Sequence, residues 1–125
     1  MSMINDYQKG WALRYLREAK AELIAAKKSP YMAPSLILEA VKKAQAAIYY
    51  SLGDPISIET IVHQTINKKQ LVNDPTLKYL VNVEKTIRNV ARTAEAERKK
   101  AFKQADDLIQ TATTIVKLFT GEKVD

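Results

Sequence analysis

Residues 31–55 carry all the signals of one complete helix, and this segment constrains the fold more than any other part of the chain. Pro34 suits a first helical turn, where its missing N–H group costs no hydrogen bond. Gly53 can adopt a left-handed conformation after the last turn, and Pro55 prevents continuation. The apolar residues form one seam that consists of Ile37, Val41, Ala44, Ile48 and Leu52, widened by Ala33, Ala40 and Ala47. The seam predicts a helix that packs closely against another helix.

An earlier segment supplies the partner for that helix. Asn5 or Asp6 can cap it, and it is expected to run from about Tyr7 to Lys28. Its apolar residues keep the same three-four spacing and are Ala12, Leu16, Ala19, Leu23 and Ala26. The link of residues 29–32 is short enough to allow only an antiparallel hairpin, with each helix about 30 Å long.

The first 55 residues resemble a known family. A Leu/Ala-rich first helix is followed by a short link with Tyr31 and Ala33, and the second helix ends in E-A-V-K-K-A-Q-A-A-I-Y-Y-S-L-G. This order is similar to the front half of the HEPN domains, which are small helical bundles associated with nucleotide or RNA chemistry. The resemblance implies a bundle of four or five helices, frequent homodimers and, in many members, a metal-independent ribonuclease site made of an Arg followed four to six residues later by a His.

That ribonuclease motif is absent. His63 is the single histidine of the chain, and residues 54–59 read D-P-I-S-I-E without an arginine. No histidine follows Arg88, Arg92 or Arg98. We therefore assign no catalytic residue and expect His63 to be a half-buried helix residue that no activity requires.

Composition limits the remaining chemistry. The 125 residues make one domain, 1–125, large enough to fold without a disulfide or a metal. There is no cysteine, so the cytosol is the expected location, and no run of about 18 apolar residues is available to span a membrane. Glu59 and His63 lie one helical turn apart, yet a di-iron bundle needs a second histidine. We expect neither metal nor cofactor.

The second half of the chain predicts more helices. A third helix is expected after Pro55, started by Ser57 or by Asp54 with Pro55, and its inward residues would be Ile58, Ile61, Val62 and Ile66. Asn73-Asp74-Pro75 repeats the start signal, and no glycine or proline occurs from Thr76 to Thr120.

This last stretch can form one helix or two. One heptad frame contains Leu77, Leu80, Ile87, Ala91, Ala94, Ala101, Ala105, Leu108, Ala112, Ile115 and Phe119, interrupted by Glu84 and Arg98. A single helix would be about 65 Å long and would project from the bundle. The compact alternative is a bend within the polar segment of residues 93–100. In either case the frame is longer than the first hairpin can cover, which favours a homodimer.

Basic residues are concentrated in the segment that follows Asn73-Asp74. Residues 75–105 hold eight basic and three acidic side chains. Six of the basic residues form a ridge that could neutralise backbone phosphates, and they are Lys78, Lys85, Arg88, Arg92, Lys99 and Lys103. A solvated face kept for solubility is the plainer interpretation. No aromatic residue interleaves this basic ridge, which weakens the case for single-strand recognition.

Five aromatic residues are expected near the ends of the first hairpin, and these are Trp11, Tyr15, Tyr31, Tyr49 and Tyr50. They could line a base pocket, but capping of the core is the favoured role.

The sequence thus predicts an all-α, up-and-down antiparallel bundle of four or five helices that is not an enzyme. The expected function is that of a HEPN-like interaction module, a homodimer that binds a protein partner such as a nucleotidyltransferase, or RNA or DNA through the basic ridge. The alternative is a diverged ribonuclease or a nucleotidyltransferase-accessory protein of the toxin–antitoxin kind.

Overall fold

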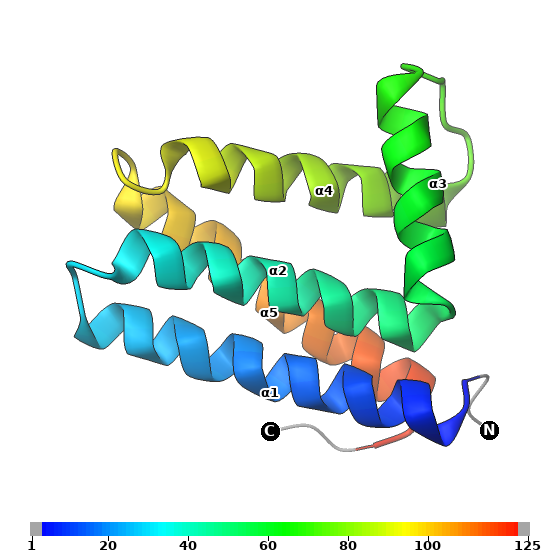
Figure 1. Ribbon diagram of the computed structural model, residues 1–125, viewed down its shortest axis with the longest axis horizontal. Helices are drawn as coiled ribbons and strands as arrows, with labels where there is room; N and C mark the ends of the chain where they lie inside the picture. Colours follow the sequence, from blue (N-terminus) through cyan, green and yellow to red (C-terminus); the bar gives the residue numbers. More distant parts are fainter. Residues whose placement is uncertain (1–3, 123–125) are drawn as a thin grey trace.

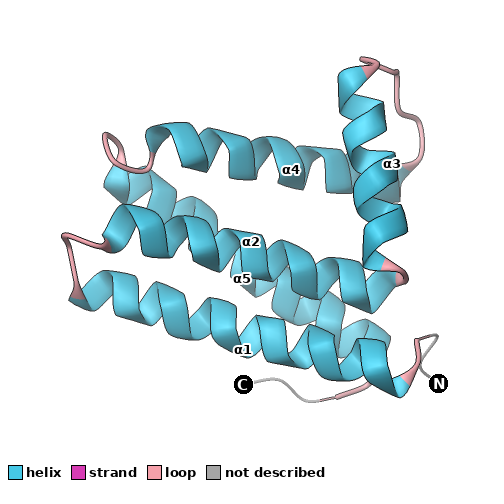
Figure 2. Cartoon of the chain, in the orientation of Figure 1, coloured by secondary structure: helices cyan, strands magenta, loops and turns pink. Residues whose placement is uncertain are grey.

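The computed structural model describes residues 4–122, which fold into five α-helices. Helix α1 is Asp6–Lys28, α2 is Ala33–Leu52, α3 is Pro55–Asn67, α4 is Pro75–Thr93 and α5 is Arg98–Thr120. No strand occurs in this part of the chain (Figure 2). The predicted all-α bundle is confirmed.

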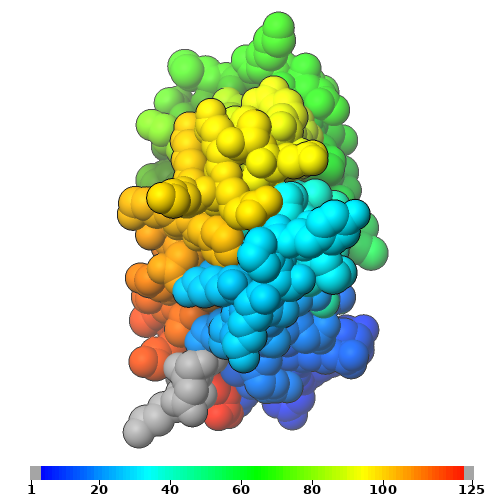
Figure 3. Space-filling view, turned by 90° about the vertical axis from the view of Figure 1, so that its left-hand side faces the viewer, coloured from blue at the N-terminus to red at the C-terminus, as the bar shows by residue number. Residues whose placement is uncertain are grey.

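Four of the helices run along one axis, while α3 stands across one end of the bundle (Figure 1). Helices α1 and α2 form the expected antiparallel hairpin, and α4 and α5 form a second one. The α1–α2 link and the α4–α5 turn lie at the same end of the molecule, opposite α3 (Figure 3). The crossing helix α3 departs from a strictly up-and-down order.

The helix ends follow the capping signals closely. Asn5 forms a capping box with Gln8, so Asn5 rather than Asp6 caps α1. Asp54 and Asp74 each accept a hydrogen bond from the backbone three residues on, with a proline at the first helical position. Gly53 has φ 158° and ψ −138°, so the left-handed conformation predicted there is wrong.

Helix α2 is the centre of the bundle and packs against all four other helices. Its small residues make this possible, because alanine lets neighbouring helix axes approach closely on several sides. The fully buried alanines of the molecule come mainly from three helices and are Ala12 and Ala19 of α1, Ala33, Ala40, Ala44 and Ala47 of α2, and Ala105 and Ala112 of α5.

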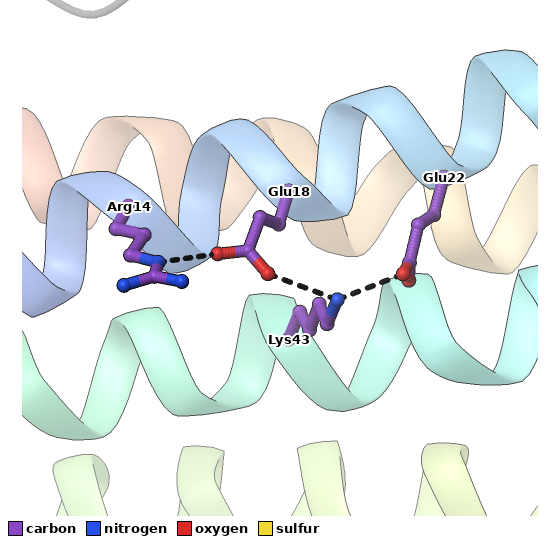
Figure 4. A network of polar contacts seen from close by, with 4 residues as sticks. All are labelled: Arg14, Glu18, Glu22 and Lys43. Carbon is purple, nitrogen blue, oxygen red and sulfur yellow. Dashed lines mark hydrogen bonds and ion pairs between the residues drawn. The ribbon is translucent and has the colours of Figure 1, made fainter.

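A polar network fixes α2 against α1 along the edge of their interface (Figure 4). Lys43 Nζ of α2 lies 3.0 Å from Glu18 Oε1 and 2.8 Å from Glu22 Oε1, both of α1. Arg14 Nε donates to the other oxygen of Glu18 at 2.9 Å. These hydrogen bonds from Lys43 and Arg14 lower the pKa of Glu18, and the bonds to Glu22 and Glu18 raise that of Lys43. The network selects one register of the hairpin.

The stretch after Pro75 forms two helices that bend within the predicted segment. Glu97 N–H still donates to Thr93 O at 2.7 Å, so the turn is a distorted continuation of the helix. Because α5 folds back along α2 and α1, no half-helix projects from the bundle. Length alone therefore no longer requires a second copy of the chain.

The single heptad frame describes only part of the core. Ala91 is exposed, whereas Val83 and Val90, which lie outside the frame, are buried. In α3, Val62 is buried as expected, but Ile61 is 50% exposed, so its predicted inward position is wrong. The reason is that α3 touches the bundle with one narrow face when it stands across the end.

Candidate nucleic-acid interface

The outer face of α4 displays four of the six predicted ridge residues. Lys78, Lys85, Arg88 and Arg92 are all exposed, because their spacings of seven, three and four place them on the side of α4 away from the core. Lys99 and Lys103 are exposed too, but they lie on α5 beyond the bend. The row of basic residues spaced by seven on α4 therefore does not extend to Lys99 or Lys103. Lys103 instead pairs with Asp107 at 3.5 Å.

A groove of about 390 Å³ separates this basic face from the end of α3. Three lysines line it: Lys69 from the loop after α3, and Lys78 and Lys85 from α4. None of the three forms an ion pair within the described residues. Three unneutralised cations around one concave surface raise the local concentration of anions. We call this concave surface the lysine groove.

The backbone of Lys69 is unusual. Its φ is 51°, in the left-handed region that side chains with a Cβ atom rarely adopt. The turn is closed by Lys69 N–H donating to Ile66 O at 3.1 Å and Gln70 N–H donating to Thr65 O at 3.2 Å, which is the pattern of a Schellman motif. Glycine is preferred at this position, and the structure places a lysine there. The polar run N-K-K-Q was the only sequence signal for this turn.

A second cavity, of about 280 Å³, lies on the opposite flank of α4, against α5. Its lining combines polar and apolar groups and consists of Tyr79, Asn82, Val83, Thr86, Gln104, Asp107, Leu108 and Thr111. We call it the α4–α5 pocket. Asn82 lines both this pocket and the lysine groove, so the two are neighbours.

The pocket contains two features that the sequence did not reveal. Tyr79 follows Lys78 directly in the sequence, and the structure places it in this pocket, on the flank of α4 away from the lysine groove. Burial raises the pKa of Tyr79, with a smaller opposing effect from its hydrogen bond with Thr111, so the phenol stays neutral. The buried Oε1 atom of Gln104 has no hydrogen-bond partner among residues 4–122.

Glu84, the acidic interruption of the heptad frame, joins α2, α3 and α4. Its side chain is 12% exposed and accepts hydrogen bonds at 2.8 Å from Gln45 Nε2 and from Arg88 Nε. His63 Nε2 lies 3.7 Å away, and the His63 side chain is 41% exposed. Burial alone would raise the pKa of Glu84, but the bonds from Gln45 and Arg88 outweigh burial, and the net pKa is lowered.

The Glu84 cluster changes how two predicted residues are understood. Arg88 is held by a carboxylate, so it contributes less free charge to the basic face than Lys78 or Lys85. His63 has the expected half-buried position, with a carboxylate as its neighbour. Tyr49 belongs to this cluster through a 3.1 Å hydrogen bond from Gln45, and burial raises its pKa most strongly of all the tyrosines whose shift is resolved.

The remaining aromatic residues stack at one end of the first hairpin. Trp11, Tyr15 and Tyr50 have ring centroids 5.6 to 6.2 Å apart, and Tyr7 meets the edge of Trp11. Tyr31 is 96% exposed at the far end and takes no part. The stack covers the core between α1 and α2, which is the role favoured for it.

Comparison with protein-family models, with curated proteins and with solved structures gave no match. The resemblance to the HEPN domains therefore stays a prediction. Among residues 4–122, no three His, Asp or Glu side chains are placed to share a metal ion. No helix of the described part of the chain combines the length and the apolar character that crossing a membrane demands.

Replacing Glu84 by Gln tests the cluster. We expect Glu84→Gln to lower the free energy of unfolding by about 1–2 kcal/mol at pH 7, because two charge-assisted hydrogen bonds are weakened. Since the folded-state pKa of Glu84 lies below its unfolded value of about 4.3, this contribution is present above that pH. It disappears as the pH falls through the lower folded-state pKa. Urea unfolding at pH 7 and at pH 3 measures the difference in free energy of unfolding between the wild-type protein and Glu84→Gln. An equal difference at the two pH values would contradict the assignment.

Replacing Lys69 by Gly tests the strained turn. Glycine adopts φ 51° without the clash of a Cβ atom, so Lys69→Gly is expected to raise the free energy of unfolding by about 0.5–1 kcal/mol. Lys69→Ala keeps a Cβ atom and serves as the control, with little change expected. Thermal unfolding of the three proteins gives the comparison, and destabilisation by Gly would mean that the lysine side chain stabilises the fold.

Proposed function

We propose that this protein is a non-catalytic helical interaction module that binds the phosphates of RNA or DNA through α4 and the lysine groove. The observation that carries the proposal is the set of three unpaired lysines, Lys69, Lys78 and Lys85, around one concave surface. The net charge of +6 adds a general attraction for polyanions.

The geometry favours an extended strand over a small anion. Lys78, Lys85 and Arg92 recur every seven residues, so they lie about 10 Å apart along α4. Lys69 extends the charged surface sideways across the groove. Four cations spread in this way match successive phosphates of a nucleic acid, and a single phosphate could reach only one or two of them.

The chemistry of the described residues supports binding without cleavage. His63 is the only imidazole of the chain, and its nearest ionic neighbour, Glu84, is already engaged by Gln45 and Arg88. The lysine groove is lined by no histidine and no carboxylate, so it offers neither a general base nor a general acid suited to neutral pH. The alternative, a diverged ribonuclease or a nucleotidyltransferase accessory, would need a proton-transfer group at the phosphates.

Salt dependence is the signature of such binding. With four phosphate contacts, the logarithm of the association constant should fall with the logarithm of the salt concentration with a slope of about 3. We expect the triple variant Lys78→Gln, Lys85→Gln, Arg92→Gln to reduce this slope by about 2 to 3 and to leave thermal stability unchanged, because all three side chains are exposed. Fluorescence anisotropy with a labelled RNA or DNA strand of 20 nucleotides measures the slope.

The matched control removes the same charge elsewhere. Lys28, Lys42 and Lys117 are exposed on α1, α2 and α5, and their replacement by Gln should leave the slope almost unchanged. Equal losses in the two triple variants would show that only net charge matters and would reject the site. RNA that is cleaved by the purified protein, with cleavage lost in His63→Ala, would reject the non-catalytic part of the proposal.

We propose in addition that the protein is a homodimer, and a groove between α1 and α5 supports this proposal. The groove measures about 550 Å³, and its floor is apolar, with Leu23, Ile109 and the 54% exposed Ile24. One wall is basic and carries Lys27 of α1, while the other is acidic and carries Asp106 of α5. Leu23 and Ile109 are already buried in one copy, so two copies that meet at this groove would newly cover Ile24 of each.

Charge selects one of the two possible symmetries. With the two-fold axis across the helices, α1 would face α1, and the lysines of the two copies would repel each other. With the axis along the groove, α1 of one copy faces α5 of the other, and Lys27 meets Asp106. The second arrangement is the one we propose.

A charge swap tests that arrangement. Lys27→Glu and Asp106→Lys should each weaken the dimer at least tenfold, because each sets like charges against each other across the interface. The double variant restores opposite charges and should recover most of the affinity. Sedimentation equilibrium from 1 to 100 µM gives the dimer dissociation constants of the wild-type protein and the three variants. A monomeric wild-type protein across that range, or a double variant no better than the single ones, would reject the interface.

A further inference from the structure

We infer that the α4–α5 pocket binds one unstacked base of a single-stranded nucleic acid whose phosphates lie on the lysines of α4. This inference rests on the proposed function and goes beyond it, because it turns a charged surface into a site that distinguishes bases. It starts from position. The pocket and the lysine groove occupy the two flanks of one helix and share Asn82, so a strand that follows Lys78 and Lys85 passes the mouth of the pocket.

The size of the pocket suits one base. Its volume of about 280 Å³ lies just below the ~300 Å³ at which pockets for drug-sized ligands begin. Val83 and Leu108 give it a buried apolar floor, and the ring of Tyr79 forms part of its wall. An aromatic ring beside polar groups is the usual environment for a base that has left its stack.

Gln104, one of the residues that line the pocket, carries an acceptor that lacks a donor. Its Oε1 atom is buried and has no partner among the described residues, and a buried acceptor without a hydrogen bond is unfavourable. Asp107 adds further acceptor atoms at the α5 side; its pairing with Lys103, at 3.5 Å between two exposed side chains, is weak. The missing group is therefore an N–H donor, and the exocyclic amino groups of adenine and cytosine supply one.

Charge fixes the orientation of the strand. Lysines border α4 on the side of the groove, whereas Asp107 borders the pocket on the side of α5. Phosphates are attracted to the first side and repelled from the second. The base consequently points across α4, with its amino edge toward Gln104 and Asp107. Uracil presents carbonyl oxygens on either side of its one N–H group, and these would face the acceptors of the pocket.

Homopolymers test the inference. We expect RNA decamers of adenine and of cytosine to bind the full-length protein about tenfold more tightly than a decamer of uracil, at one fixed salt concentration. DNA decamers of adenine, cytosine and thymine should follow the same order, since base and phosphate are the groups recognised. The salt slope should be the same for all of them, because the phosphates are the same.

One substitution and its control locate the effect. Gln104→Leu removes the acceptor at nearly constant volume, and it should reduce the preference for adenine and cytosine to within about twofold without changing the salt slope. Gln64→Leu changes the same residue type at an exposed position of α3 that lines neither the pocket nor the grooves, and it should keep the preference. Circular dichroism verifies the fold of both variants. The order of homopolymer affinities is measured on the wild-type protein, so that part of the test does not depend on any variant.

The two proposals fail differently. Salt-dependent binding with equal affinity for all bases would overturn the base pocket and leave the phosphate-binding function in place. A preference that persists in Gln104→Leu would overturn the assignment of the pocket. The absence of any binding at low salt would overturn the function and the base pocket together.

Discussion

Close packing around α2 is the constraint on which the rest of the structure depends. Four alanines of this helix are fully buried, and α2 packs against all four other helices. Such a core leaves little tolerance for larger residues, since an added methylene at an alanine contact would push two helices apart. The stability of the bundle rests on many small contacts, and the position of α4 and α5 follows from the shape of α2.

This arrangement also explains where ligands can bind. The centre of the bundle is filled, and the three concave surfaces described above lie where helices diverge: between α3 and α4, between α4 and α5, and between α1 and α5. Helix α4 has fewer helix neighbours than α2 and presents a long outer face. Two of the three concave surfaces border that face, which concentrates the polar and basic chemistry of the molecule there.

The helices themselves were predictable from the sequence, because capping signals and three-four spacing act over a few residues. Asn5, Asp74 and the polar stretch around Glu97 marked where helices begin or bend. The candidate site was only partly predictable. Lys78 and Lys85 were found by their spacing. The position of Lys69 depends on a left-handed turn, and the sequence has no glycine there that would predict it.

The residues that sequence reasoning missed depend on contacts between distant segments. Gln45 meets Glu84 across 39 residues, and Tyr79 shares a pocket with Gln104 only because α5 folds back on α4. A heptad frame drawn through both helices as one rod cannot bring such residues together. It assigned Glu84 to an interruption of the core, whereas the structure makes that carboxylate the junction of three helices.

The turn between α4 and α5 has a consequence for folding in crowded conditions. Residues 94–97 are all alanine or glutamate, both strong helix formers, and the backbone there already keeps one helical hydrogen bond across the bend. The local sequence favours a straight rod, and the hairpin is closed by the packing of α5 on α2, α1 and α4. A chain that extends before α5 docks can donate that helix to a neighbour, which makes this turn the hinge for domain swapping.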